Sequence, residues 1–185
     1  MLIDAVYTWV DGSDENWKRK KLEYSQKSNR EISADAQSDA RFMDNEELKY
    51  SIRSLFTYAS WINNIYIITD NQIPNWLNEN CPKIKIVDHK EIFQNHEVLP
   101  TFSSRAIEAN LHHIPSLSEC FIYFNDDMFI GDFCVPEYFF LDNGQPRIFI
   151  SDLITIKRKK HLNSDFLKNH KNNEHQNAVI NSSRL

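Results

Sequence analysis

Short apolar runs alternate with polar, helix-like stretches along most of the chain, and acids follow the runs. The runs cover residues 3–10, 65–69, 84–87, 121–124 and 147–151, and the acids after them are Asp11, Asp70, Asp88, Asp126 with Asp127, and Asp152. Runs of this length that are rich in Ile, Val, Phe and Tyr are typical of buried strands. The alternation predicts βαβ units in an α/β, Rossmann-like domain with a mainly parallel sheet. Carboxyl ends of parallel strands share one edge of a sheet, so we expect these acids to gather there.

The segment after the first run predicts a helix that ends near Ser25. Ser13 or Asp14 is placed to cap this helix, because their side-chain oxygens can accept hydrogen bonds from the first free backbone amides. We expect Trp17 and Leu22 to face inward. The polar residues 26–40 that follow read as a long loop.

A second helix is predicted before the second run. Asp44 and Glu47 have capping-box spacing. Apolar residues then recur at helical intervals, at Leu48, Ile52, Leu55, Phe56 and Ala59. Further along the chain, residues 74–77 predict a short helix opened by a proline, and Ser103 or Ser104 is a candidate cap for a helix that contains Arg105.

The acids at the strand ends have two interpretations. Adjacent carboxylates such as Asp126 and Asp127 repel each other unless a cation neutralises them, and Mg²⁺ and Mn²⁺ prefer carboxylate oxygen. A single Asp after a strand is instead typical of a cap on the next helix. We therefore predict a metal site at Asp126 and Asp127, and helix caps at Asp70, Asp88 and Asp152.

Composition favours one main domain with a basic segment behind it. The 185 residues carry a net charge of −5, yet residues 157–185 contain seven Lys or Arg against two acids. We expect a catalytic domain over 1–156 and a basic segment over 157–185. The three cysteines form no CxxC pair, and neither a basic leader nor a long apolar stretch occurs. These features favour a cytoplasmic protein, at the inner face of the membrane with at most peripheral contact, and we expect no nucleic-acid partner.

Only three glycines occur, which excludes both a GxxxxGK phosphate loop and a GxGxxG dinucleotide loop. A bound phosphate must then be held by metal, by arginine or by helix ends. Arg41, Arg53 and Arg105 lie near predicted helix starts or on polar helix faces. A nucleotide-diphosphate donor fits this pattern. Residue chemistry alone leaves sugar transfer and phosphoryl transfer both open.

Three stretches carry a family resemblance. Residues 4–14, Asp-Ala-Val-Tyr-Thr-Trp-Val-Asp-Gly-Ser-Asp, resemble the first conserved region of the Stealth family. Residues 41–55 and 67–77 resemble the second region, and residues 99–108 with 121–131 are similar to its end and to the third. The family includes bacterial capsular polysaccharide phosphotransferases and the animal lysosomal-enzyme N-acetylglucosamine-1-phosphotransferase. The resemblance implies a three-layer, nucleotide-sugar-transferase-type domain that moves a hexose 1-phosphate from a UDP-sugar to a polysaccharide hydroxyl and releases UMP.

The resemblance also suggests roles for individual residues. Asp126 and Asp127 would hold Mg²⁺ or Mn²⁺, with Asn125 orienting them. The remaining candidates divide into a uridine or diphosphate pocket made by Trp9, Asp11 and Gly12, phosphate clamps at Arg41, Arg53 and Arg105, and an acceptor-side carboxylate at Asp44.

Stealth proteins have a fourth region with a histidine-containing stretch, and residues 177–185 look like the approach to it. We therefore expect a chain truncated before that region. Two alternatives stay open at this point: a metal-dependent glycosyltransferase that releases UDP, and a non-catalytic fragment that binds the donor.

Overall fold

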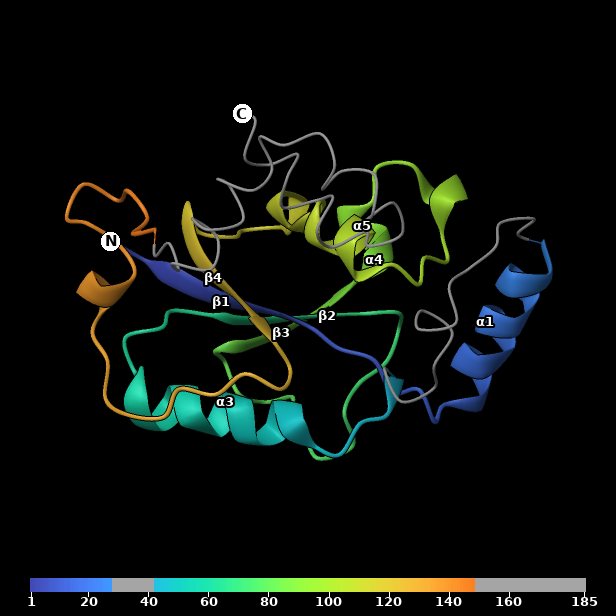
Figure 1. Ribbon diagram of the computed structural model, residues 1–185, viewed down its shortest axis with the longest axis horizontal. Helices are drawn as coiled ribbons and strands as arrows, with labels where there is room; N and C mark the ends of the chain where they lie inside the picture. Colours follow the sequence, from blue (N-terminus) through green and yellow to red (C-terminus); the bar gives the residue numbers. More distant parts are fainter. Residues whose placement is uncertain (28–41, 149–185) are drawn as a thin grey trace, which may run out of the picture. The chain divides into compact units, whose positions relative to one another are not determined.

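A computed structural model describes residues 1–27 and 42–148 of the chain. The chain divides into two compact units, Met1–Gln145 and Pro146–Leu185, and nearly all described residues belong to the first. At the centre of this unit lies a parallel sheet in the order β3-β2-β1-β4 (Figure 1). Its strands are β1 (Ile3–Thr8), β2 (Ile65–Thr69), β3 (Ile84–Asp88) and β4 (Cys120–Asn125). The prediction of an α/β fold with a mainly parallel sheet is confirmed.

Both faces of the sheet are apolar, because alternate residues of each strand point to opposite sides. Ala5 and Tyr7 of β1 pack on one side with Ile67 of β2, whereas Val6 and Ile68 pack on the other. A parallel sheet needs cover on both faces. The central strands β1 and β2 are buried over nearly their whole length.

The long helix α3 (Glu47–Tyr58) covers one face of the sheet (Figure 1). Its apolar stripe is buried as predicted at Leu48, Ile52 and Leu55, but Phe56 is exposed. The predicted capping box is wrong. Glu46 occupies the cap position with a left-handed φ of 66° and makes no side-chain cap, and the Asp44 carboxylate accepts from the Glu46 amide at 3.0 Å.

Short helices cover the opposite face of the sheet, which gives three layers (Figure 1). They are α4 (His89–Ile92), α5 (Ser104–Glu108) and η3 (Leu111–His113). Two further short helices are η2 (His96–Val98), which follows α4 and has no buried residue, and η4 (Pro136–Tyr138), which follows β4. Asp88 caps α4 in a full capping box with Glu91, and Ser103 caps α5, so both cap predictions are confirmed.

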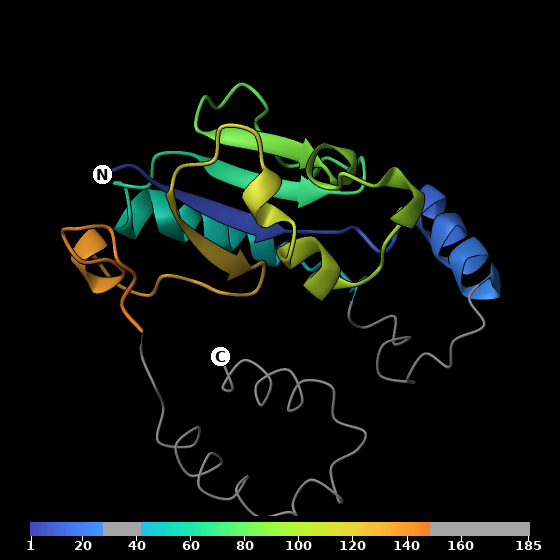
Figure 2. The ribbon, with the colours of Figure 1, turned by 90° about the horizontal axis from the view of Figure 1, so that it is seen from above.

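Helix α1 (Glu15–Lys27) lies beyond the strand ends, beside the sheet (Figure 2). Asp14 caps it as predicted, accepting from the Asn16 and Trp17 amides at 2.7 and 3.0 Å. Trp17 is buried, and the centre of its ring lies 4.9 Å from the centre of the Phe42 ring and 5.4 Å from that of Phe102. The prediction that Leu22 faces inward is wrong, because its side chain is 58% exposed. Trp17 is the buried residue of this helix, and Tyr24 adds a second ring contact with Phe102.

Two smaller predictions also fail. The segment at Pro74 makes a single turn closed by the Leu77 amide and no helix. Asp70 caps nothing; its carboxylate pairs with Lys20 at 2.9 Å. Asp152 and most of the fifth run lie outside the described residues, as does the predicted domain boundary at residue 156. None of the described helices combines the length and the apolar composition needed to cross a membrane.

Candidate active site at the carboxyl ends of the strands

Asp126 and Asp127 occupy the middle of a tight turn at the end of β4. The Met128 amide donates to the Asn125 carbonyl at 3.1 Å, which closes the turn around the two acids. Asn125 is the register partner of Thr8, so the turn begins at the carboxyl end of the central strand β1. Asp126 is partly buried and Asp127 is exposed. The turn therefore places two adjacent carboxylates where the sequence predicted them.

The segment after this turn, residues 128–130, is bound to α3. Ser51 Oγ donates to the Met128 carbonyl, and the Ile130 amide donates to Ser54 Oγ at 3.0 Å. Behind Ser51 lies the Tyr7 hydroxyl of β1, 2.8 Å from Ser51 Oγ. Helix α3 thus holds the far end of the turn.

Acids from three segments influence one another electrostatically. Burial raises the pKa of Asp126, and the charges of Asp127 and Glu47 raise it further. Burial likewise raises the pKa of Asp44, with smaller upward contributions from Glu47 and Asp11. The edge therefore carries negative charge from the end of β1, past the start of α3, to the end of β4. Bringing a cation to it would relieve this repulsion.

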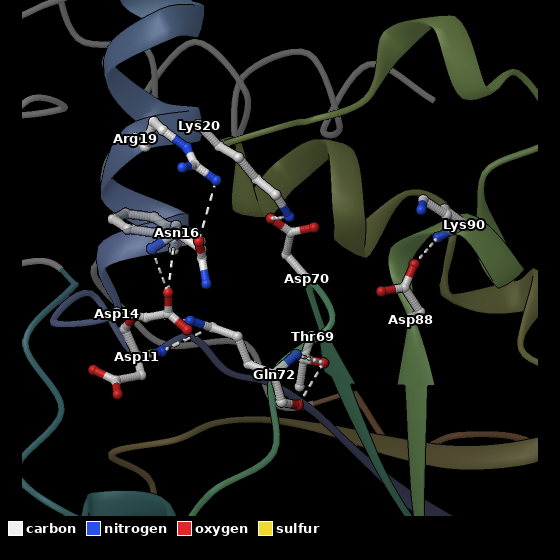
Figure 3. A network of polar contacts seen from close by, with 11 residues as sticks. Asp11, Asp14, Asn16, Arg19, Lys20, Thr69, Asp70, Gln72, Asp88 and Lys90 are labelled. Atoms are coloured by element: carbon white, nitrogen blue, oxygen red, sulfur yellow. Dashed lines mark hydrogen bonds and ion pairs between the residues drawn. The ribbon is translucent and has the colours of Figure 1, made fainter.

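The loop after β1 is tied to the loop after β2 by Gln72 (Figure 3). The Asp11 amide donates to Gln72 Oε1 at 3.0 Å, and Gln72 Nε2 donates to the Asp11 carbonyl at 3.0 Å. The Asp11 carboxylate accepts from the Ser13 amide at 2.8 Å and the Ser13 hydroxyl at 2.6 Å. Gln72 itself is buried. Its backbone amide donates to the Thr69 hydroxyl, which in turn donates to the Gln72 backbone carbonyl. Asp11 is held in place by a buried amide that the sequence analysis did not single out.

Gly12 and Trp9, which are predicted to line the nucleotide pocket, are both packed closely against other residues of the domain. Gly12 N donates to the Phe42 carbonyl at 2.8 Å, and a Cβ at Gly12 would lie only 2.2 Å from that oxygen. Trp9 is 6% exposed within the core under α3. Its Nε1–H lies close enough to Asp44 to lower the pKa of that carboxyl, yet it has no acceptor in hydrogen-bond geometry. Close packing against Phe42 explains why position 12 requires glycine.

The predicted phosphate clamps are spread over several elements. Arg53 is exposed on α3, with its guanidinium carbon 5.6 Å from the centre of the Tyr50 ring. Arg105 is exposed in the first turn of α5, on the opposite face of the sheet, and Arg41 lies outside the described residues. Arg53 and Arg105 thus belong to helices on opposite faces of the sheet. Their clamp role stays a prediction.

No group of three or more His, Cys, Asp or Glu side chains within residues 1–27 and 42–148 is arranged to hold a metal ion. The donor set is instead two adjacent carboxylates. That set suits Mg²⁺, which is commonly bound by one or two carboxylates together with substrate phosphates and waters. Asp126 and Asp127 therefore fit a metal shared with a diphosphate rather than one enclosed by protein.

Sequence reasoning missed the residues that hold the site together. Ser51 interrupts the buried stripe formed by Leu48, Ile52 and Leu55, and it is fully buried. A hydroxyl within an apolar stripe needs a partner, and that was the available signal. Glu47, predicted from sequence only as part of a cap, also adds to the negative charge around Asp126.

Comparison with known proteins confirms the family resemblance, but residues 121–131, which the sequence analysis assigned in part to the third region, lie within the region 2 match. The family model of Stealth protein conserved region 2 matches residues 41–148, and that of conserved region 1 matches residues 1–29. The chain belongs to the Stealth family. The region 1 match contains Asp11, and the region 2 match contains Asp44, the two arginines at 53 and 105, and the acidic turn.

Several curated relatives are similar over most of this Stealth chain. An exopolysaccharide phosphotransferase of Streptomyces coelicolor is 52% identical over 149 residues, which is 80% of this chain and 27% of the relative. A capsular polysaccharide phosphotransferase of Haemophilus influenzae is 50% identical over 149 residues, 80% of this chain and 40% of the relative. A capsular polysaccharide phosphotransferase of Actinobacillus pleuropneumoniae is 48% identical over 151 residues, which is 81% of this chain and 40% of the relative. The chain thus spans well under half the length of these relatives.

Proposed function

We propose that this chain carries the donor-binding part of a sugar-phosphate transferase, which moves a hexose 1-phosphate from a UDP-sugar to a hydroxyl of a capsular or extracellular polysaccharide. The observation that carries the proposal is the closed turn with Asp126 and Asp127 at the carboxyl end of β4. Ligands of open α/β sheets bind at this edge. Membership of the Stealth family and the names of its phosphotransferase relatives support the choice of reaction.

The proposed reaction is an in-line displacement at phosphorus. The acceptor oxygen forms a bond to the phosphorus that carries the hexose, and the bond from that phosphorus to the UMP oxygen breaks. The acceptor proton passes to a base, and the bond between the sugar C1 and its oxygen stays intact. Such transfers depend mainly on positioning and on stabilisation of charge. UMP, not UDP, is therefore the expected product.

Asp126 and Asp127 are proposed to bind Mg²⁺ or Mn²⁺, with Asn125 closing the turn that orients them. The metal, when bound, would offset negative charge on the diphosphate. Asp44 is proposed as the acceptor-side carboxylate. Burial raises its pKa, which makes it a better proton acceptor than an exposed Asp. Asp11, Gly12 and Trp9 are assigned to the nucleotide side, and Arg41, Arg53 and Arg105 to the phosphates.

The decisive experiment uses a ³²P label to show where the phosphate next to the sugar goes. The chain is incubated with Mg²⁺, acceptor polysaccharide and a panel of UDP-hexoses labelled with ³²P in the phosphate next to the sugar. Transfer of a hexose phosphate puts the label into the polymer and releases unlabelled UMP. Labelled UDP with an unlabelled polymer would instead identify a glycosyltransferase. Mg²⁺-dependent UDP-sugar binding without either product would identify a donor-binding fragment and refute turnover by this chain.

The metal assignment has its own test in the same protein. Asp126→Asn and Asp127→Asn are expected to abolish metal-dependent binding of the donor, measured by calorimetry. Asp132→Asn is the matched control, because Asp132 is an exposed acid in the same segment and its carboxylate accepts from the Phe133 amide. Equal donor affinity in wild type and both turn variants would disprove the assignment.

A further inference from the structure

Two serine hydroxyls on successive turns of α3 bind the segment after the acidic turn. Ser51 Oγ donates to the Met128 carbonyl, and Ser54 Oγ accepts from the Ile130 amide at 3.0 Å. Ser54 Oγ in turn donates to the Ser51 carbonyl at 2.7 Å. The pair supplies one donor and one acceptor to residues 128–130, as a neighbouring strand would.

The Tyr7 hydroxyl completes this arrangement. Ser51 uses its only proton on Met128, so Tyr7 donates to Ser51 Oγ across 2.8 Å. Tyr7 and Ser51 are both fully buried, and the Tyr7 ring stacks on Phe124 of β4 with centroids 5.3 Å apart. Hydroxyls in such surroundings are costly to leave unpaired. The contact is therefore a fixed part of the fold.

The acidic turn is held at both ends by the central strand. Asn125, at its start, pairs in the sheet with Thr8 of β1, and Met128, at its end, is reached from Tyr7 of the same strand through Ser51. Asp126 and Asp127 lie between these two anchors. Repulsion between their carboxylates favours opening of the turn, and the anchors oppose it.

We propose that Ser51, supported by Tyr7, is a positioning residue for the metal-binding turn and thereby sets its affinity for a divalent cation. The proposal rests on the metal role of Asp126 and Asp127 proposed above. Mg²⁺ demands near-ideal octahedral geometry, so ligands that can spread apart bind it poorly. Removing a group that orients metal ligands typically lowers affinity by about 10–100-fold.

The test compares two buried tyrosines and one serine. Ser51→Ala removes the anchor on Met128, and Tyr7→Phe removes the donor behind it while leaving the ring in place. Tyr66→Phe is the matched control, because Tyr66 of the neighbouring strand β2 is 3% exposed and donates to the Ser116 carbonyl at 3.0 Å. Binding of Mn²⁺ in the presence of UDP is measured by electron paramagnetic resonance, and thermal unfolding is measured without metal.

Ser51→Ala is expected to raise the Kd for Mn²⁺ by about 10–100-fold. Tyr7→Phe should raise it less but in the same direction, and Tyr66→Phe should lose stability without changing the Kd. Hydrogen exchange of the Met128 and Ile130 amides should speed up in Ser51→Ala, less in Tyr7→Phe, and not in Tyr66→Phe. An Mn²⁺ affinity within twofold of wild type in both Ser51→Ala and Tyr7→Phe would overturn the proposal.

Asp126→Asn separates this proposal from the function on which it rests. If Asp126→Asn loses Mn²⁺ binding while Ser51→Ala keeps it, the turn binds metal but Ser51 does not position it. If wild type and Asp126→Asn bind Mn²⁺ equally, or wild type does not bind it, the metal role of the turn itself is wrong. A Kd that rises equally in Tyr66→Phe and Ser51→Ala would show general loss of stability instead of positioning.

Discussion

Replacing Gly12 by alanine tests how the loop after β1 is packed. The added Cβ would lie 2.2 Å from the Phe42 carbonyl oxygen, 2.6 Å from its Cβ and 2.8 Å from its carbonyl carbon. Two of these atoms belong to the backbone, so no side-chain rotation relieves the clash. Phe42 is also held in place, since its carbonyl accepts from Gly12 N at 2.8 Å and its ring packs on Trp17. The two segments must separate to admit the methyl group.

The expected cost follows from these contacts. Overpacking of a fixed site costs about 1–3 kcal/mol, and loss of the hydrogen bond adds about 1 kcal/mol. The total of about 2–4 kcal/mol corresponds to a fall in Tm of about 5–15 °C for a chain of this size. Gly131→Ala is the matched control, because a Cβ built there has no heavy atom within 4 Å apart from Gly131 itself and its two chain neighbours. It should be neutral or stabilise by up to about 1 kcal/mol.

The assay is thermal and urea unfolding of wild type, Gly12→Ala and Gly131→Ala without ligand, followed by calorimetry with UDP and Mg²⁺. Separation of Phe42 from the loop should destabilise Gly12→Ala before any ligand is added. The reasoning would be refuted by a Gly12→Ala protein as stable as Gly131→Ala. Loss of UDP binding at unchanged stability would then assign the glycine to close approach of a ligand.

Three further substitutions have defined outcomes. Asp4→Asn should cost about 2–3 kcal/mol in urea unfolding, since the buried Asp4 carboxylate accepts three hydrogen bonds. Burial alone would raise the pKa of Asp4, but these bonds lower it, so the difference from wild type should begin to shrink below the ordinary pKa of Asp and be lost as pH falls through the lowered pKa of the folded state. Lys20→Met should cost about 1 kcal/mol by breaking the half-exposed pair with Asp70, and should raise the pKa of His89 in an NMR titration. Asp126→Asn should stabilise the metal-free protein by about 0.5–1 kcal/mol at neutral pH, because it removes a partly buried charge beside like charges; an unchanged Tm would contradict this.

The parts of the fold that the sequence predicted are those fixed by local pattern. The strands form where apolar runs can be covered on both faces, and α3 forms where its apolar stripe meets the sheet. The prediction for Leu22 failed because helix α1 contacts the rest of the domain through Trp17 and Tyr24, and Leu22 lies on its exposed side. The Pro74 segment failed because it is too short to continue beyond one turn.

The same distinction holds for the candidate site, where local sequence pattern predicts the acids but not the residues that support them. The acids at the ends of β1 and β4 could be placed from sequence, because parallel topology puts strand ends at one edge. Their supports could not, because each acts across a long separation in the chain. Gln72 reaches Asp11 across 61 residues, and Ser51 reaches Met128 across 77. Only pairing in three dimensions shows which hydroxyl or amide is used.

The supports described for the acidic turn are hydroxyls and backbone groups, and such uncharged supports suit the cation site proposed above. A Lys or Arg beside Asp126 would relieve its repulsion but would also compete with a metal for the carboxylate. Ion pairs between described residues engage Glu15, Glu46 and Asp70. Hydroxyls and backbone groups fix the position of the turn while leaving its charge available. On the proposed function, the negative charge that the fold keeps at this edge is what a bound divalent cation would neutralise.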